Sequence, residues 1–273
     1  MTILGEDMPT EKINGITLSF DEYGAGEPVV FVSGTGAPGR VWRTYQVPAL
    51  LRAGFRAITV DNRGIAPTDL CADGFTLDDM AADIAGLIEH LGIGPCPVVG
   101  FSLGSIIVQE LLISRPDLVS KAVLIATRGR TDPLGTAASE AEVELYDSGV
   151  KLPARFEAVI NVIRGFSRRT LNDPQIVRDW LDIFELSPIS IGASRAQLTL
   201  DIIPNRLESL RGVPNECLVV GFSDDLVAPP HLAREVADSI PRSTYLQIPD
   251  CGHYGQLEDP ETVNAALIDF LRR

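Results

Sequence analysis

Cysteine is scarce in this sequence, and the cysteines that are present are far apart. The four are Cys71, Cys96, Cys217 and Cys251, and no two of them form a CxxC pair. The chain is also too long to be a small secreted domain held together by disulfides, so we expect free thiols. A zinc site needs clustered ligands, and the three histidines are far from one another in the sequence. We therefore expect no metal and no cofactor.

Positive charge and long apolar runs are lacking as well. The chain has 23 Lys and Arg against 37 Asp and Glu, a formal net charge of −14, which repels nucleic-acid phosphates and anionic membranes. No run approaches the roughly 18 apolar residues of a membrane span, and the acidic start, 1–12, does not have the composition of a secretory signal. We expect a cytoplasmic protein with a small-molecule substrate and no nucleic-acid or membrane partner. The sequence leaves open whether the protein forms a homodimer.

Strand-like and helix-like segments alternate through most of the chain. Residues 11–23 alternate apolar and polar side chains around Asn14-Gly15, which predicts an antiparallel hairpin. The apolar run 28–34 is typical of a buried parallel strand. Further strands are predicted at 55–60, 96–101, 121–126, 216–221 and 243–248, and helices at 41–53, 76–91, 105–114, 230–240 and 261–271. This order predicts an α/β fold, an open parallel sheet with helices on its faces.

The alternation stops between about residues 127 and 210. Helix-like patches occur at 139–146, 154–163 and 175–184, without a strand of core quality. The chain is 45% apolar and 22% charged, as in an ordinary globular protein with one large core. We therefore predict one core, residues 1–130 and 211–273, with a helical cap inserted at residues 131–210.

A GxSxG motif, residues 100–104, lies between a predicted strand and a predicted helix. This is the context of a nucleophile elbow, a sharp turn that exposes a serine at the top of the sheet. Glycines are needed there because side chains would collide with the backbone of so tight a turn. Ser102 is the candidate nucleophile. The alternative is a serine that caps an ordinary helix.

A serine hydroxyl needs a base to accept its proton, and histidine is the expected base. His90 is at the end of a predicted helix and His231 at the start of another, where surface roles are expected. His253 lies in a turn-rich loop between the last predicted strand and the last predicted helix. We assign it as the base, since the order serine, acid, histidine also fits the fold.

The acid should follow the strand at 216–221, where Asp224 and Asp225 are adjacent. The spacing from Gly221 favours Asp224, whereas the spacing to Pro229 favours Asp225. We choose Asp225, because a DxxxP register fixes the acid against the following helix. Asp224 is then a loop acid. The acid would hold the imidazole tautomer and stabilise the imidazolium.

Two backbone N–H groups are candidates for an oxyanion hole. One belongs to Leu103, the residue after the nucleophile, and the other to Thr35 in the loop Ser33-Gly34-Thr35-Gly36. That loop lacks the lysine of a P-loop and the frame of a dinucleotide-binding loop, so phosphate binding is not expected.

Together these segments resemble the α/β-hydrolase superfamily over almost the whole chain. The resemblance rests on SGTG after a buried strand, Trp42, DNRG at 61–64, GFSLG, DDLVAPP and GHY. It is closest to small cytosolic Ser-His-Asp members with a helical cap after the sixth strand, and it implies a mostly parallel eight-stranded sheet. Such members include esterases, lactonases, carbon–carbon bond hydrolases and cofactor-free haloperoxidases. The chain departs from the family pattern at Ser33-Gly34, where HG is usual, and at IAPTD after DNRG.

The leading hypothesis is a serine hydrolase that forms an acyl-enzyme on Ser102 from a small ester, lactone or thioester. The alternative is a non-hydrolytic enzyme of the same fold that carries out elimination, cyclisation or acyl transfer in secondary metabolism. A binding protein with an inactive triad is a third possibility. In the cap, Arg164, Arg168, Arg169 and Arg178 are either surface residues or a patch for a substrate carboxylate.

Overall fold

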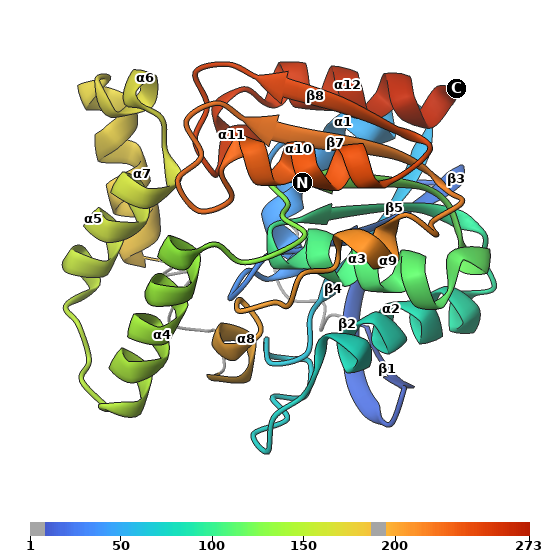
Figure 1. The fold of residues 1–273 in the computed structure, drawn as a ribbon, viewed down its shortest axis with the longest axis horizontal. Helices are drawn as coiled ribbons and strands as arrows, with labels where there is room; N and C mark the ends of the chain where they lie inside the picture. Colours follow the sequence, from blue (N-terminus) through green and yellow to red (C-terminus); the bar gives the residue numbers. More distant parts are fainter. Residues whose placement is uncertain (1–8, 187–194) are drawn as a thin grey trace.

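In this computed structural model, the described part of the chain comprises residues 9–186 and 195–273. Residues 1–8 of the predicted core and 187–194 of the predicted cap lie outside it. The described residues form an eight-stranded sheet of order β1-β2-β4-β3-β5-β6-β7-β8 (Figure 1). The strands are β1 (Thr10–Ile13), β2 (Ile16–Tyr23), β3 (Glu27–Val32), β4 (Phe55–Asp61), β5 (Cys96–Phe101), β6 (Val119–Ile125), β7 (Glu216–Phe222) and β8 (Ser243–Ile248).

Strands β3 to β8 pair in parallel, whereas β2 runs antiparallel to both of its neighbours, β1 and β4. The prediction of a mostly parallel eight-stranded sheet is therefore confirmed. The predicted hairpin joins β1 to β2, and its turn residues Asn14 and Gly15 have φ values of 48° and 79°. Asparagine and glycine tolerate this left-handed backbone better than other residues do.

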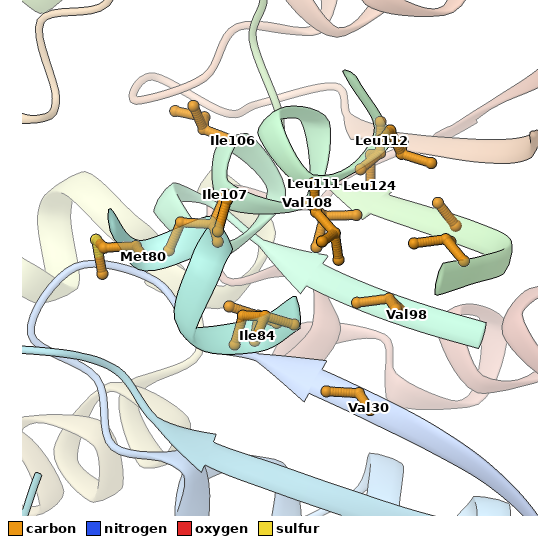
Figure 2. Packing of buried hydrophobic residues seen from close by; sticks show 14 of the residues in the cluster. Val30, Met80, Ile84, Val98, Ile106, Ile107, Val108, Leu111, Leu112 and Leu124 are labelled. Carbon is orange, nitrogen blue, oxygen red and sulfur yellow. The ribbon is translucent and has the colours of Figure 1, made fainter. Parts of the chain in front are cut away.

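Helices cover both faces of the sheet. Helices α2 (Leu77–Leu91), α3 (Leu103–Ser114) and α10 (Pro230–Ser239) pack on one face, and α1 (Gln46–Arg52) and α12 (Pro260–Arg272) on the other (Figure 1). Side chains of β3 alternate between the two layers, because successive residues of a strand point to opposite faces. Val30 packs with α2 and α3 (Figure 2), whereas Phe31 packs against Trp42 on the other face.

The helix predicted over 41–53 is divided in two. A 3₁₀ turn covers Gly39–Arg43, and α1 begins only at Gln46. Pro48 explains the division. A proline has no N–H to donate, so it is tolerated in the first turn of a helix but would break a helix that began five or more residues earlier. A start at Gln46 places Pro48 in that first turn.

The described residues between β6 and β7 form helices without strands. These helices are α4 (Pro133–Asp147), α5 (Ala154–Gly165), α6 (Arg168–Leu171), α7 (Pro174–Leu186), α8 (Arg195–Thr199) and α9 (Leu207–Leu210). Helices α5 and α7 have a small apolar cluster of their own around Phe166 and Phe184. Ile203 and Leu210 already belong to the main core cluster. The division of the chain into a core and a cap at residues 131 and 210 stays a prediction.

The register of the sheet brings the loops after β3, β5 and β6 to one edge. Val32 of β3 pairs with Gly100 of β5, and Phe101 pairs with Ile125 of β6, so these strands end at the same level. The strand order reverses between β3 and β5, because β4 lies on one side of β3 and β5 on the other. In open α/β sheets a crevice forms at the carboxyl ends of the strands at such a point. Ser102 follows β5 directly at this position.

Candidate active site

The backbone at Ser102 has a conformation that few residues adopt, with φ 52° and ψ −121°. It joins the end of β5 to the start of α3, as the motif predicts. A Cβ atom at Gly104 would lie 2.1 Å from the carbonyl oxygen of Val32, and one at Gly100 would lie 2.4 Å from the carbonyl oxygen of Gly104. Both distances are far inside van der Waals contact. Only glycine therefore allows β3, β5 and α3 to meet this closely.

Ser102, His253 and Asp225 form a hydrogen-bonded line. The Ser102 hydroxyl lies 3.0 Å from Nε2 of His253, and Nδ1 of the same ring lies 2.9 Å from Oδ2 of Asp225. A carboxylate can only accept a hydrogen bond, so this contact assigns the ring proton to Nδ1 and leaves Nε2 to accept from the serine. All three residues are buried, with 3% to 7% of their surface exposed.

The structure brings Asp225, and not Asp224, to the imidazole. Oδ1 of Asp225 also accepts from the backbone N–H groups of Val227 and Ala228, both at 2.8 Å, which fixes the carboxylate in place. Asp224 is half-buried, and its carboxylate accepts from the Ser223 hydroxyl instead, at 2.8 Å. The acid that the spacing to Pro229 favours is thus the one that lies next to the imidazole. Its role in catalysis stays a prediction.

Aromatic rings surround the imidazole. The rings of Phe101 and Tyr254 lie 5.1 Å and 5.7 Å from the His253 ring, measured between centroids. Tyr254 also contacts Phe166 of the segment between α5 and α6 at 5.5 Å. Burial raises the pKa of Tyr254 to about 12, so its hydroxyl stays protonated at neutral pH. The buried imidazole thus lies in an aromatic environment.

The loop after β3 lies beside the candidate nucleophile. A Cβ atom at Gly34 would be 3.0 Å from Cβ of Ser102, so the absence of a side chain there permits the close approach. Leu103 is the first residue of α3, and the backbone N–H of that position has no partner within a helix. Leu103 and Thr35 are thus placed on the two segments that flank Ser102. That their backbone N–H groups donate to an oxyanion stays a prediction.

Sequence reasoning missed three residues that hold this loop. The Asn62 side chain donates to the carbonyl oxygen of Ser33 at 2.8 Å. Gln197 of α8 accepts from the Gly36 N–H at 2.8 Å, and the Asp201 carboxylate accepts from the Thr35 hydroxyl at 3.2 Å. Asn62 is part of the DNRG motif, and this motif is the one sequence signal that could have indicated its role. Nothing in the sequence connects the other two with a loop more than 160 residues away.

Sequence reasoning missed a fourth residue, Glu258. It joins the loop that carries His253, residues 249–254 and here called the histidine loop, to the segment between β6 and β7. Its carboxylate accepts from the Gly252 N–H at 2.6 Å and from the Ser167 hydroxyl at 2.6 Å. It also accepts from the Ser167 N–H and from the Thr170 hydroxyl. Gly252 precedes His253 directly, so Glu258 fixes the backbone that carries the imidazole. No motif in the sequence indicates Glu258, which lies five residues after His253.

The remaining candidates lie elsewhere. His90 and His231 are exposed, each at an end of its helix. In the predicted cap, Arg164 forms an ion pair with Glu142, and Arg178 donates to the side chain of Gln175 on the surface. The structure thus gives Arg164 and Arg178 partners within the protein. Arg168 and Arg169 are exposed, and Arg169 donates to Sγ of Cys251 at 3.6 Å.

The cysteines are all free, and burial raises the pKa of Cys251 beside the histidine loop to about 12. Among residues 9–186 and 195–273, no three His, Cys, Asp or Glu side chains gather in a way that could hold a metal ion. In the same ranges no helix has the length and apolar character needed to cross a bilayer.

A family model described as "Alpha/beta hydrolase family" matches residues 29–266. The chain belongs to this family. A relative from Mycobacterium tuberculosis, named "Putative non-heme bromoperoxidase BpoC", is 51% identical over 256 residues, which are 93% of this chain and 97% of that protein. A "Putative carbamate hydrolase RutD" from Caulobacter segnis is 27% identical over 276 residues, 97% of this chain and 99% of the relative.

Solved structures agree with this membership. The crystal structure of BpoC from M. tuberculosis superimposes with a TM-score of 0.89 at 48% identity and covers 93% of this chain and 95% of that one. A thermophilic esterase from Thermogutta terrifontis gives a TM-score of 0.81 at 26% identity and covers 98% of both chains. The resemblance to the α/β-hydrolase superfamily is thus confirmed, and these relatives are named as a bromoperoxidase, a carbamate hydrolase and an esterase.

Glu258 provides a test of how the histidine loop is held. We expect Glu258→Ala to lower the free energy of unfolding by roughly 2–4 kcal/mol, because the buried N–H of Gly252 and the groups of Ser167 lose a charged acceptor. Denaturant titration measures the change. The control is Glu261→Ala in the first turn of α12, which is exposed and should cost about 0.5 kcal/mol or less. Equal losses for both variants would contradict this role of Glu258.

Proposed function

We propose that the protein is a serine hydrolase that cleaves an ester, lactone or thioester bond of a small organic substrate through an acyl-enzyme on Ser102. The observation that carries the proposal is the line from Ser102 through His253 to Asp225, with contacts of 3.0 Å and 2.9 Å. A serine hydroxyl attacks a carbonyl effectively only when a base within hydrogen-bond reach takes its proton. The esterase similar in structure supports the same reaction class.

In the first half of the proposed reaction, Oγ of Ser102 attacks the carbonyl carbon and its proton moves to Nε2 of His253. Asp225 stabilises the imidazolium that forms and does not itself take the proton. The negative charge on the carbonyl oxygen is met by the backbone N–H groups of Leu103 and Thr35. The intermediate then breaks its bond to the leaving group, which receives the proton from His253.

In the second half, a water molecule attacks the acyl group and gives its proton to His253. The bond to Oγ of Ser102 breaks, and the serine regains its proton from the imidazole. The same three residues thus serve both halves. The product acid contains one oxygen from solvent, which distinguishes hydrolysis from elimination, cyclisation or acyl transfer.

The name of the BpoC relative favours a second candidate function, the oxidation of halide. The same acyl-enzyme can react with hydrogen peroxide instead of water, with His253 taking the peroxide proton and Ser102 leaving. The released peroxycarboxylic acid transfers an oxygen atom to bromide and becomes the carboxylic acid. This activity would require a carboxylic acid or ester, peroxide and bromide together, and it would depend on Ser102. Bromination of a dye in that mixture measures it.

The Ser102→Ala variant tests the proposed function. We expect turnover of p-nitrophenyl esters to fall by about 10⁶-fold and labelling by a fluorophosphonate probe to disappear, because no other group replaces the nucleophile. With the wild-type enzyme in ¹⁸O-labelled water, mass spectrometry should find one solvent oxygen in the released acid. An unlabelled product would indicate a non-hydrolytic reaction. A folded wild-type protein that neither turns over esters nor takes the label would be an inactive relative of these enzymes.

Two adjacent acids allow a matched test of the third catalytic residue. We expect Asp225→Asn to lower kcat by about 10⁴-fold, because the amide favours the wrong tautomer of His253. Asp224→Asn changes a carboxylate that accepts from Ser223 and should leave kcat within about twofold of the wild type. Steady-state kinetics with p-nitrophenyl acetate measures both. A larger loss in the Asp224 variant would reverse the assignment.

A further inference from the structure

The loop Ser33-Gly34-Thr35-Gly36 has little stiffness of its own. Two of its four residues are glycines, and Gly36 has a φ of 67°. Glycine leaves the backbone freer than any other residue, so such a loop keeps one conformation only if its surroundings hold it. Preorganised donors are what an oxyanion hole requires, since a donor that must reorient during the reaction loses much of its effect. The contacts of this loop therefore decide whether it can stabilise charge.

One contact comes from Gln197 of α8, whose side chain is fully buried. Its Oε1 accepts from the Gly36 N–H at 2.8 Å, and its Nε2 donates to the carbonyl oxygen of Arg63 at 2.7 Å. The amide thus joins the loop after β3 to the loop after β4. The Gly36 N–H belongs to the peptide group that follows Thr35. Holding it restricts rotation on the carboxyl side of Thr35.

A second contact comes from Asp201, two residues after α8. Its carboxylate accepts from the Thr35 hydroxyl at 3.2 Å and from Nη2 of Arg128 at 3.1 Å. The same Nη2 donates to the carbonyl oxygen of Asp201 at 2.9 Å, and Thr131 donates to that oxygen at 3.0 Å. Arg128 lies three residues after β6 and is buried. Asp201 is thereby tied to the sheet and presents a fixed acceptor to Thr35.

Residues 33–36 are thus held from two sides. Asn62, next to β4, fixes the carbonyl of Ser33, whereas residues 197 and 201 fix Gly36 and the side chain of Thr35. Both residues of the second group belong to the segment predicted as the cap. The geometry of the proposed oxyanion hole therefore depends on residues outside the predicted hydrolase core.

We propose that Gln197 is a positioning residue for the oxyanion-binding loop, acting through Gly36, with Asp201 assisting through the Thr35 hydroxyl. The proposal rests on the proposed function. A loop that is held in place stabilises the charged transition state and has little effect on the uncharged ester. Loss of Gln197 should therefore lower kcat and leave KM almost unchanged.

The test uses the variant Gln197→Met in the full-length protein. Methionine has a similar length and no hydrogen-bonding amide. With p-nitrophenyl acetate we expect kcat to fall by about 10²-fold and KM to stay within about twofold, since displacement of the donors by about 1 Å has an effect of that size. Phenyl trifluoromethyl ketone adds to the serine and forms an oxyanion, so its inhibition constant should rise by a similar factor.

Thr35→Val is a second variant that keeps the backbone N–H and removes only the hydroxyl that contacts Asp201. It introduces no larger side chain, so it tests the proposal even if Gln197→Met does not fold. We expect a smaller loss of kcat, about 10-fold, again without a change in KM.

The matched control is Asn215→Leu. The Asn215 side chain donates to the carbonyl oxygens of Pro116 and Val119, at 3.0 Å and 2.6 Å, at the opposite end of the strands from Ser102. It should lower stability and leave kcat and the inhibition constant within about twofold of the wild type.

An active wild type together with an unchanged kcat in both test variants would overturn this proposal alone. So would a loss that appears in KM, or an equal loss of kcat in Asn215→Leu. A wild type no more active than Ser102→Ala would instead overturn the proposed function, and this proposal with it. A selective fall in kcat with weaker ketone binding supports both.

Discussion

The close approach of α3 to the end of β3 is the constraint on which the rest of the site depends. The Gly104 backbone lies so near the carbonyl oxygen of Val32 that a Cβ atom would be 2.1 Å away. This contact forces the chain to reverse direction within one residue at Ser102, which takes a positive φ of 52°. The reversal raises the serine above the sheet edge, where the loops after β3, β7 and β8 converge. Without it, the imidazole of His253 would have no hydroxyl within reach.

The loops around Ser102 owe their positions to residues far away in the sequence. Gln197 and Asp201 hold the loop after β3, and Glu258 ties the backbone beside His253 to Ser167. In each case a side chain joins a loop of the candidate site to the segment between β6 and β7. The helices of this segment do more than cover the sheet, because the segment that contains them adds hydrogen bonds to loops that the core holds only in part. Their contacts cross the predicted boundary between core and cap.

Local sequence patterns were sufficient for the parts of the fold and site that depend on near neighbours. GxSxG between a strand and a helix indicated Ser102, and the turn-rich loop after the last strand indicated His253. Spacing patterns favour both Asp224 and Asp225, because the choice between them depends on how the backbone turns toward the N–H groups of residues 227 and 228. Gln197 could not be found at all, since its partner is 161 residues away. The helix expected over 41–53 is divided in the structure, because the apolar pattern continues through Pro48, which one continuous helix cannot accommodate.

In the proposed mechanism the Ser102 hydroxyl becomes covalently bound to the acyl group of the substrate. The most direct measurement is mass spectrometry of the protein after rapid acid quenching of its reaction with p-nitrophenyl trimethylacetate, an ester whose bulky acyl group slows deacylation. We expect a transient gain equal to the mass of one trimethylacetyl group, located by peptide mapping on Ser102. Ester turnover without this adduct, or with the acyl group on another residue, would contradict it.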